Sequence, residues 1–173
     1  DASTSAAGDI DINETDAITL TDVDTADGMI TVVAGGTITA VDVNSAAVDD
    51  DTNDILLTTT TGDILVGFVN AGSNNDVALT AAAAISEAGS DAAVDLLAGD
   101  AELVADSGIG NGNAIETTLT NVAFSNSTSG AVQITNSQSL TVAAVGALAA
   151  SSNAAGNIEL CTTSGDLAVN SAL

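Results

Sequence analysis

The chain has 173 residues, with 24 Asp and Glu residues and no Lys, Arg or His, and its formal net charge is −24 at pH 7. No ion pair between side chains can form, so water, backbone N–H groups or dissolved cations must balance every carboxylate. Affinity for nucleic acid begins with Lys and Arg at the phosphates, and the composition therefore excludes DNA, RNA and anionic lipid surfaces as partners. The sequence also lacks the run of about 18 apolar residues needed for membrane insertion as a helix.

The apolar residues predict a folded chain made of β-strands. They make up 46% of the sequence, whereas disordered acidic chains are poor in Val, Ile and Leu. Proline, which removes a donor from a sheet ladder, is absent. Aromatic residues make up only 1% of the chain, so Ile, Val, Leu and Ala must fill a narrow core.

Short segments of alternating apolar and polar residues recur along the chain, and such alternation places the apolar side chains on one face of a strand. The expected first strand of each unit contains Ile10/Ile12, Ile30/Val32, Ile55/Leu57, Val77/Leu79, Val94/Leu96, a degenerate pair Ile115/Leu119, Val132/Ile134 and Ile158/Leu160. The expected second strands include Ile18/Leu20, Ile64/Val66, Val122/Phe124, Leu140/Val142 and Leu167/Val169. The Ala-rich stretch 81–84 is predicted to be strand because of its place between such pairs.

Two ungapped internal matches support this repeat. DILLTTTTGDILV, from Asp54 to Val66, matches NIELCTTSGDLAV, from Asn157 to Val169. GDIDINETDAITLTDV, from Gly8 to Val23, aligns with GAVQITNSQSLTVAAV, from Gly130 to Val145. Units of roughly 21 residues cannot bury a core alone but can do so by stacking. We therefore expect an all-β solenoid of about eight coils, in which residues 1–173 form a single segment of a longer repetitive protein.

Two acidic turns are candidate metal sites. The first contains Asp22, Asp24 and Asp27, and the second contains Asp49, Asp50, Asp51 and Asp54. Clusters of oxygen ligands suit Ca²⁺, although hydrated acidic loops that repel neighbouring molecules have the same composition. The lone Cys161 cannot form an intrachain disulfide, and we expect it to behave as a small buried apolar residue. The alternative is an interchain or reactive thiol.

Catalysis is not expected. Without His, Lys or Arg, no ordinary base is available for a Ser nucleophile and no cation can stabilise an oxyanion. Paired carboxylates such as Asp9 with Asp11, or Asp22 with Asp24, are the only machinery left for a sugar-cleaving reaction. Ice binding through rows of Thr is a further alternative, but only some of the units carry the necessary T-x-T pattern.

Several segments resemble the units of filamentous-haemagglutinin-like exoproteins and giant bacterial repeat adhesins. They are NDILLTTTTGDILV, NNDVALTAAAAISEAG, SGIGNGNAIETTLTNVAFSNSTSG and SGAVQITNSQSLTV. The resemblance covers roughly residues 8 to 173, and it is most characteristic from Gly108 to Gly130. It implies a right-handed parallel β-helix that is secreted across an outer membrane and displayed at the cell surface.

The expected function is therefore that of an extracellular structural or adhesive shaft without catalysis. Its expected partners are further coils, through self-association end to end or within a longer parent chain, and a surface glycan or a neighbouring cell. The alternatives are a self-assembling filament subunit and a calcium-stabilised glycan-binding surface. No cofactor other than Ca²⁺ is expected.

Overall fold

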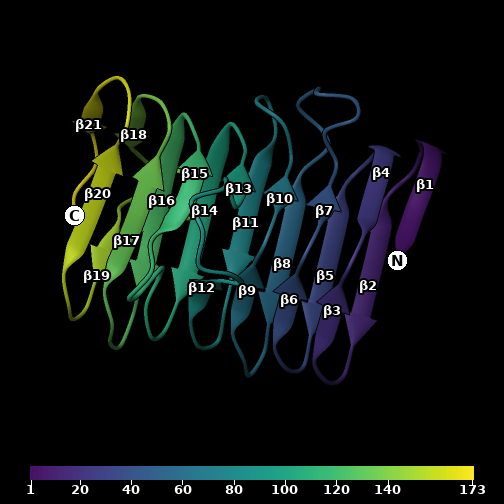
Figure 1. The fold of residues 1–173 in the computed structure, drawn as a ribbon, viewed down its shortest axis with the longest axis horizontal. Helices are drawn as coiled ribbons and strands as arrows, with labels where there is room; N and C mark the ends of the chain where they lie inside the picture. The colour runs from purple at the N-terminus through teal and green to yellow at the C-terminus, as the bar shows by residue number, and fades with distance from the viewer.

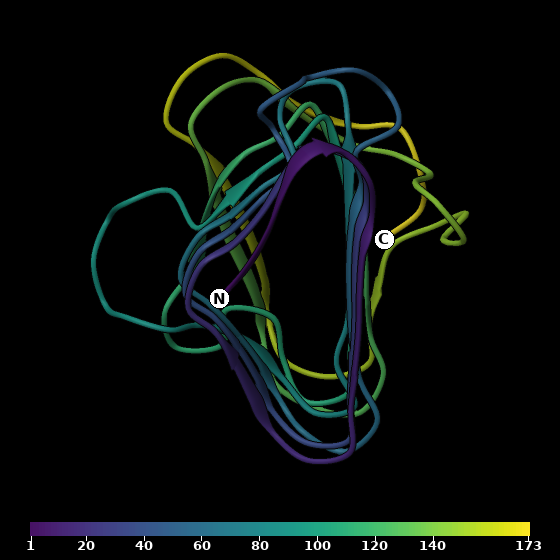
Figure 2. The same ribbon diagram turned by 90° about the vertical axis from the view of Figure 1, so that its right-hand side faces the viewer.

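The computed structural model describes all 173 residues and consists of β-strands, turns and loops. Every strand pairs in parallel with strands of other turns, and the chain forms a β-solenoid of about seven turns with about 22 residues per turn (Figure 1). Viewed from its N-terminal end, the chain turns clockwise as it recedes, so the solenoid is right-handed (Figure 2). The predicted all-β solenoid is confirmed. No helix in the structure has the length and apolarity needed to cross a membrane.

Three parallel sheets form the sides of the solenoid. The first contains β1 (Ala2–Ala7), β4 (Val23–Asp27), β7 (Val43–Asn44), β10 (Val69–Asn70), β13 (Leu96–Leu97), β15 (Ile115–Thr118), β17 (Val132–Asn136) and β20 (Ile158–Thr162). The second contains β2 (Ile10–Glu14), β5 (Ile30–Ala34), β8 (Ile55–Thr59), β11 (Asp76–Thr80), β14 (Asp100–Ala105), β16 (Asn121–Asn126), β18 (Leu140–Val142) and β21 (Leu167–Val169), with β19 (Ser152–Asn153) also paired to β16. The third contains β3 (Ile18–Leu20), β6 (Ile38–Ala40), β9 (Ile64–Val66) and β12 (Ile85–Glu87).

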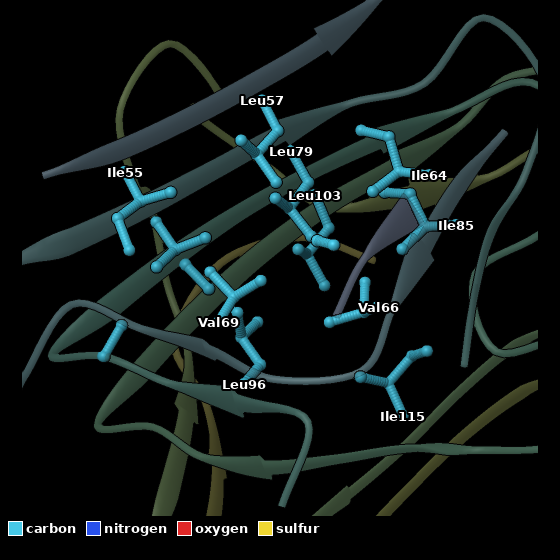
Figure 3. Close-up of a cluster of buried hydrophobic side chains, with 14 of the residues drawn as sticks. Ile55, Leu57, Ile64, Val66, Val69, Leu79, Ile85, Leu96, Leu103 and Ile115 are labelled. Atoms are coloured by element: carbon cyan, nitrogen blue, oxygen red, sulfur yellow. The ribbon is translucent and has the colours of Figure 1, made fainter. Parts of the chain in front are cut away.

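The core consists of columns of like side chains, one from each turn. One column begins at Ile18, Ile38, Ile64 and Ile85 in the third sheet and continues through single bridges at Ile109. It ends at Val132 and Ile158. The columns merge into one cluster of 33 buried residues. Figure 3 shows part of this cluster, in which Leu57, Leu79 and Leu103 lie in a row. Each turn therefore buries its apolar face mainly against the turns above and below it.

Buried asparagines form hydrogen bonds with backbone N–H and C=O groups where the chain turns a corner inside this core. Asn136 is fully buried, and its Oδ1 accepts hydrogen bonds from Thr117 Oγ1 and the Leu119 N–H, both at 2.8 Å. Its Nδ2 donates to the carbonyl oxygens of Leu119 at 3.1 Å and Gln138 at 3.0 Å. The side chain thus joins two successive turns, and it leaves none of its own polar groups unpaired.

The internal sequence matches do not stack on one another. Ile55 lies in the second sheet, whereas its sequence counterpart Ile158 lies in the first. Likewise, Ile10 lies in the second sheet and its counterpart Val132 in the first. The expected first strands therefore do not all stack on one side: those up to Val77/Leu79 lie in the second sheet, and those from Val94/Leu96 onward contribute to the first. Every flat side requires the same alternation of apolar and polar residues, so one sequence unit fits more than one side.

The stretch Ala81–Ala84 is not a strand, contrary to the expectation, and it is not a helix either. It forms the corner between β11 and β12. The Ala83 N–H donates to the Gly62 carbonyl at 3.0 Å, and the Ala84 N–H donates to Asp63 Oδ1 at 2.9 Å. Small side chains suit this corner because the chain passes close to the turn beneath it.

Replacing Leu57 with Ala should lower the free energy of unfolding by about 2–5 kcal/mol, because this side chain is fully buried between Val32 and Leu79 and leaves a cavity. Leu56, the next residue along β8, points outward and is only half-buried. The matched change Leu56→Ala should cost less than about 1 kcal/mol. Urea unfolding followed by circular dichroism measures both values, and equal losses would contradict the assigned strand faces.

Candidate functional site

The first predicted acidic turn lies against the N-terminal coil. Asp24 in β4 is in register with Ser3 on one side and Asn44 on the other. Its carboxyl group interacts with that of Asp22, and burial, this contact and the charges of Asp22 and Asp42 raise the pKa of Asp24. Asp27 lies at the far end of the same strand. The turn therefore gathers a carboxyl pair and not a triad.

The carboxylates of the second acidic turn mostly accept hydrogen bonds from backbone N–H groups and hydroxyl groups. Asp49 accepts hydrogen bonds from Ser73 Oγ at 2.8 Å and from the Asn74 N–H at 2.9 Å, and these bonds lower its pKa. Asp50 accepts from Thr52 Oγ1 at 2.7 Å, and Asp54 accepts from the Asp76 N–H at 2.9 Å. These carboxylates fix the loop and link it to the next turn.

No three of the seven predicted aspartates bring carboxylate oxygens within 4.8 Å of one another. Calcium binding at these two turns stays a prediction. The structure does place a third group of acids, which the sequence analysis missed, in that arrangement. It contains Glu87, Asp95 and Glu116, and each residue contributes one carboxylate oxygen to a group whose members all lie within 4.8 Å.

This three-carboxylate cluster lies at the base of an excursion from the third sheet to the first. Glu87 ends β12, Asp95 directly precedes β13, and residues 88–94 between them form the wide teal loop of Figure 2. Glu116 comes from β15 on the next turn. The Glu116 N–H donates to Asp95 Oδ2 at 2.9 Å, and the Asp95 N–H donates to the Glu116 carbonyl at 2.8 Å. Parallel pairing between turns thus fixes the positions of Asp95 and Glu116.

The cluster contains buried charge without a counterion. Asp95 is only 3% exposed. The Oε2 atoms of Glu87 and Glu116 are buried and accept no hydrogen bond. Burial raises the pKa of Asp95 to about 7, despite the hydrogen bond from the Glu116 backbone, and the charges of Glu87 and Glu116 add to the increase. Burial and the charge of Glu87 also raise the pKa of Glu116.

The sequence carried only a weak signal for this cluster, because its members are separated by 8 and 21 positions along the chain. Asp95 and Glu116 become neighbours because Leu96 pairs with Thr117. Glu87 joins them because the excursion returns to the solenoid close to where it left. The sequence analysis placed Val94/Leu96 and Ile115/Leu119 in successive units, and β13 and β15 do pair in this way. The position of Glu87 beside them could not be read from the repeat, because it depends on where the excursion returns.

Acidic residues also form a column along one edge of the second sheet. Asp76 is in register with Asp100 on the next turn, and Asp54 lies opposite Asp76 on the turn before. On the turn after Asp100, the same position is occupied by Asn121, whose Nδ2 donates a hydrogen bond to Asp100 Oδ1 at 2.7 Å. Loss of water around the carboxylate, followed by the charges of Asp100, Asp54 and Asp51, raises the pKa of Asp76 to about 6.

The surface has three hollows, of about 190, 200 and 360 Å³. The smallest lies beside the three-carboxylate cluster and is lined in part by Glu116, Ala92 and Val94. Cys161 is exposed on the outward face of β20, opposite Thr135, so the expectation of a buried thiol is wrong.

The stacked parallel sheets and the columnar core define this chain as a β-solenoid repeat protein. No family model, curated protein or solved structure matches the chain.

The raised pKa of Asp76 predicts a pH-dependent stability. The folded state holds the proton of Asp76 up to about pH 6, whereas the unfolded chain releases it near the ordinary value of 3.8. The contribution of Asp76 to stability is therefore complete below pH 3.8 and is lost as the pH rises through 6. Asp76→Asn should raise the melting temperature at pH 7.5 and have little effect at pH 3.5, as measured by thermal unfolding.

The matched control for this prediction is Asp11→Asn, which removes one carboxylate from the exposed face of β2, away from the acidic column. Its effect on the melting temperature should be small at both pH values. If the two variants behave alike, the stacking of Asp54, Asp76 and Asp100 does not control this pH dependence.

Proposed function

We propose that the chain is a segment of the extracellular shaft of a bacterial surface or secreted fibre protein, with a structural or adhesive role and without catalysis. The observation that carries the proposal is the core, which runs along the solenoid from Ile10 to Val142 as one cluster of 33 buried residues. A column of this kind gains length by adding turns, and each added turn buries its apolar face in the same way. Reach and stiffness follow from this geometry.

The C-terminal coil supports continuation of the column. Its apolar side chains Ile158, Leu167 and Val169 are 38%, 41% and 51% exposed, whereas their counterparts Val132, Leu140 and Val142 one turn earlier are buried. A further coil placed on β20 and β21 would bury the exposed side chains and pair the free strand edges. Such a coil would come from a longer parent chain or from a second copy of this chain.

The surface charge also suits an extended shaft. With 24 carboxylates and no basic side chain, the sides of two shafts repel each other, whereas the C-terminal end offers apolar surface and open strand edges. Association is therefore favoured along the axis. The resemblance of Gly108–Gly130 to bacterial repeat adhesins adds a surface glycan or a neighbouring cell as the class of partner.

The shaft proposal is tested by joining two copies of the sequence in one chain. If the copies stack, the particle should lengthen by about seven turns at about 4.8 Å each, or ~34 Å, while its width stays constant. Small-angle scattering and electron microscopy measure both dimensions. Two separate particles joined by a flexible link, or an increase in width, would contradict the proposal.

The self-assembling filament is the second candidate, and the exposed side chains of the last coil favour it. Leu167→Asp combined with Val169→Asp should abolish concentration-dependent association in sedimentation velocity, because buried carboxylates at the junction have no counterion. Val41→Asp is the matched control, since Val41 is 45% exposed but lies on a side of the solenoid. If wild-type protein stays monomeric at all concentrations, the shaft requires a longer parent chain.

A further inference from the structure

We propose that Glu87, Asp95 and Glu116 bind one divalent cation, with the size and oxygen preference of Ca²⁺, at the base of the 88–94 loop. This site is distinct from the two acidic turns that the sequence predicted. It is also independent of the shaft proposal, because a solenoid with any function would have to neutralise these three closely spaced carboxylates.

The first argument concerns charge. Three carboxylates whose oxygens lie within 4.8 Å of one another repel strongly, and the burial of Asp95 removes water that would screen them. Other proteins neutralise the charge of such a group with Lys, Arg or His, but this chain has none of these residues. Only protons or cations from solution are available.

The second argument concerns unused ligand atoms. Asp95 and Glu87 each have one oxygen occupied, because Asp95 Oδ2 accepts from the Glu116 N–H and Glu87 Oε1 accepts from the Asp91 N–H at 3.0 Å. The Oε2 atoms of Glu87 and Glu116 are buried and accept nothing. Buried oxygens without donors are rare in folded proteins because they have lost water and gained no partner. A cation placed among these oxygens would supply the partner that they lack.

The third argument concerns size. Ca²⁺ binds oxygen at about 2.3–2.6 Å, so two of its ligands on opposite sides lie about 4.6–5.2 Å apart. Three oxygens that all lie within 4.8 Å of one another therefore fit around a single Ca²⁺ ion. The remaining coordination positions would be filled by water, since Ca²⁺ takes six to eight oxygen ligands. A hollow lined in part by Glu116, Ala92 and Val94 opens beside the cluster.

Binding of a cation would also hold the excursion loop against the solenoid. Glu87 and Asp95 stand at the two ends of this loop, and Glu116 belongs to the next turn. Within the loop, the Ala93 N–H donates to Asp91 Oδ1 at 2.7 Å, and the Asp91 N–H donates to Glu87. One ion bound by all three carboxylates would therefore tie the loop and two successive turns together.

The test uses the full chain, freed of metal with EDTA and dialysed at pH 7.5 in 0.15 M NaCl. Calorimetric titration with CaCl₂ should show one site per chain. Thermal unfolding should shift upward by about 5–10 °C when free Ca²⁺ is a hundredfold above its dissociation constant. The double variant Glu87→Gln, Glu116→Gln should lose both the site and the shift. Amide side chains keep the volume and remove the repulsion, so this variant should fold, as circular dichroism will verify.

The matched control is Asp22→Asn combined with Asp24→Asn, which removes the same charge from the carboxyl pair of the first acidic turn. It should keep the wild-type stoichiometry and thermal shift. Loss of binding in this control and retention in the Glu87, Glu116 variant would move the site to the predicted turn and overturn the inference. Absence of any calcium effect beyond that of equal ionic strength, with stabilisation on acidification alone, would show that protons neutralise the cluster and would also overturn it.

Discussion

The structure depends on the pairing of backbone groups between successive turns. Every strand in the three sheets is hydrogen-bonded to a strand of a neighbouring turn, and all of this pairing is parallel. A single turn has no partner for its N–H and C=O groups and too little apolar surface to form a core of its own. Stacking solves both problems at once. The columnar core, the buried asparagines and the exposed terminal coil all follow from this requirement.

The same pairing decides where charge accumulates. Residues at equal positions on successive turns lie about 4.8 Å apart, so acids that recur at one position become a column of like charge. Asp54, Asp76 and Asp100 are such a column, and Asp95 beside Glu116 is a pair made in the same way. In a chain without basic residues, this repulsion has no internal remedy. Hydrogen bonds from backbone N–H groups relieve it at Asp49 and Asp54, but they do not reach the Oε2 atoms of Glu87 and Glu116.

The sides and the C-terminal end of the solenoid differ in surface charge and in exposed apolar area, and this difference connects the architecture with the proposed role. The sides carry the carboxylates and most of the loops, including the excursions around residues 45–54, 88–94 and 143–151 that stand out from the column in Figure 2. The C-terminal end carries exposed Leu167 and Val169 and open strand edges. Contacts along the axis therefore bury apolar surface, whereas contacts between sides bring like charges together. An extended shaft is the form that this distribution of surface favours.

The sequence by itself determined the class of fold, because alternation of period two, the absence of Pro and a repeat of roughly 21 residues leave stacked coils as the way to bury Ile, Val and Leu. It also located most of the individual strands. Only the tertiary structure decided which side of the solenoid each strand occupies. Ile55 and Ile158 have matching sequence surroundings yet lie on different sides, since each side accepts the same alternation. The three-carboxylate cluster depended on that register, so residues 87, 95 and 116 became neighbours only when the turns were in place.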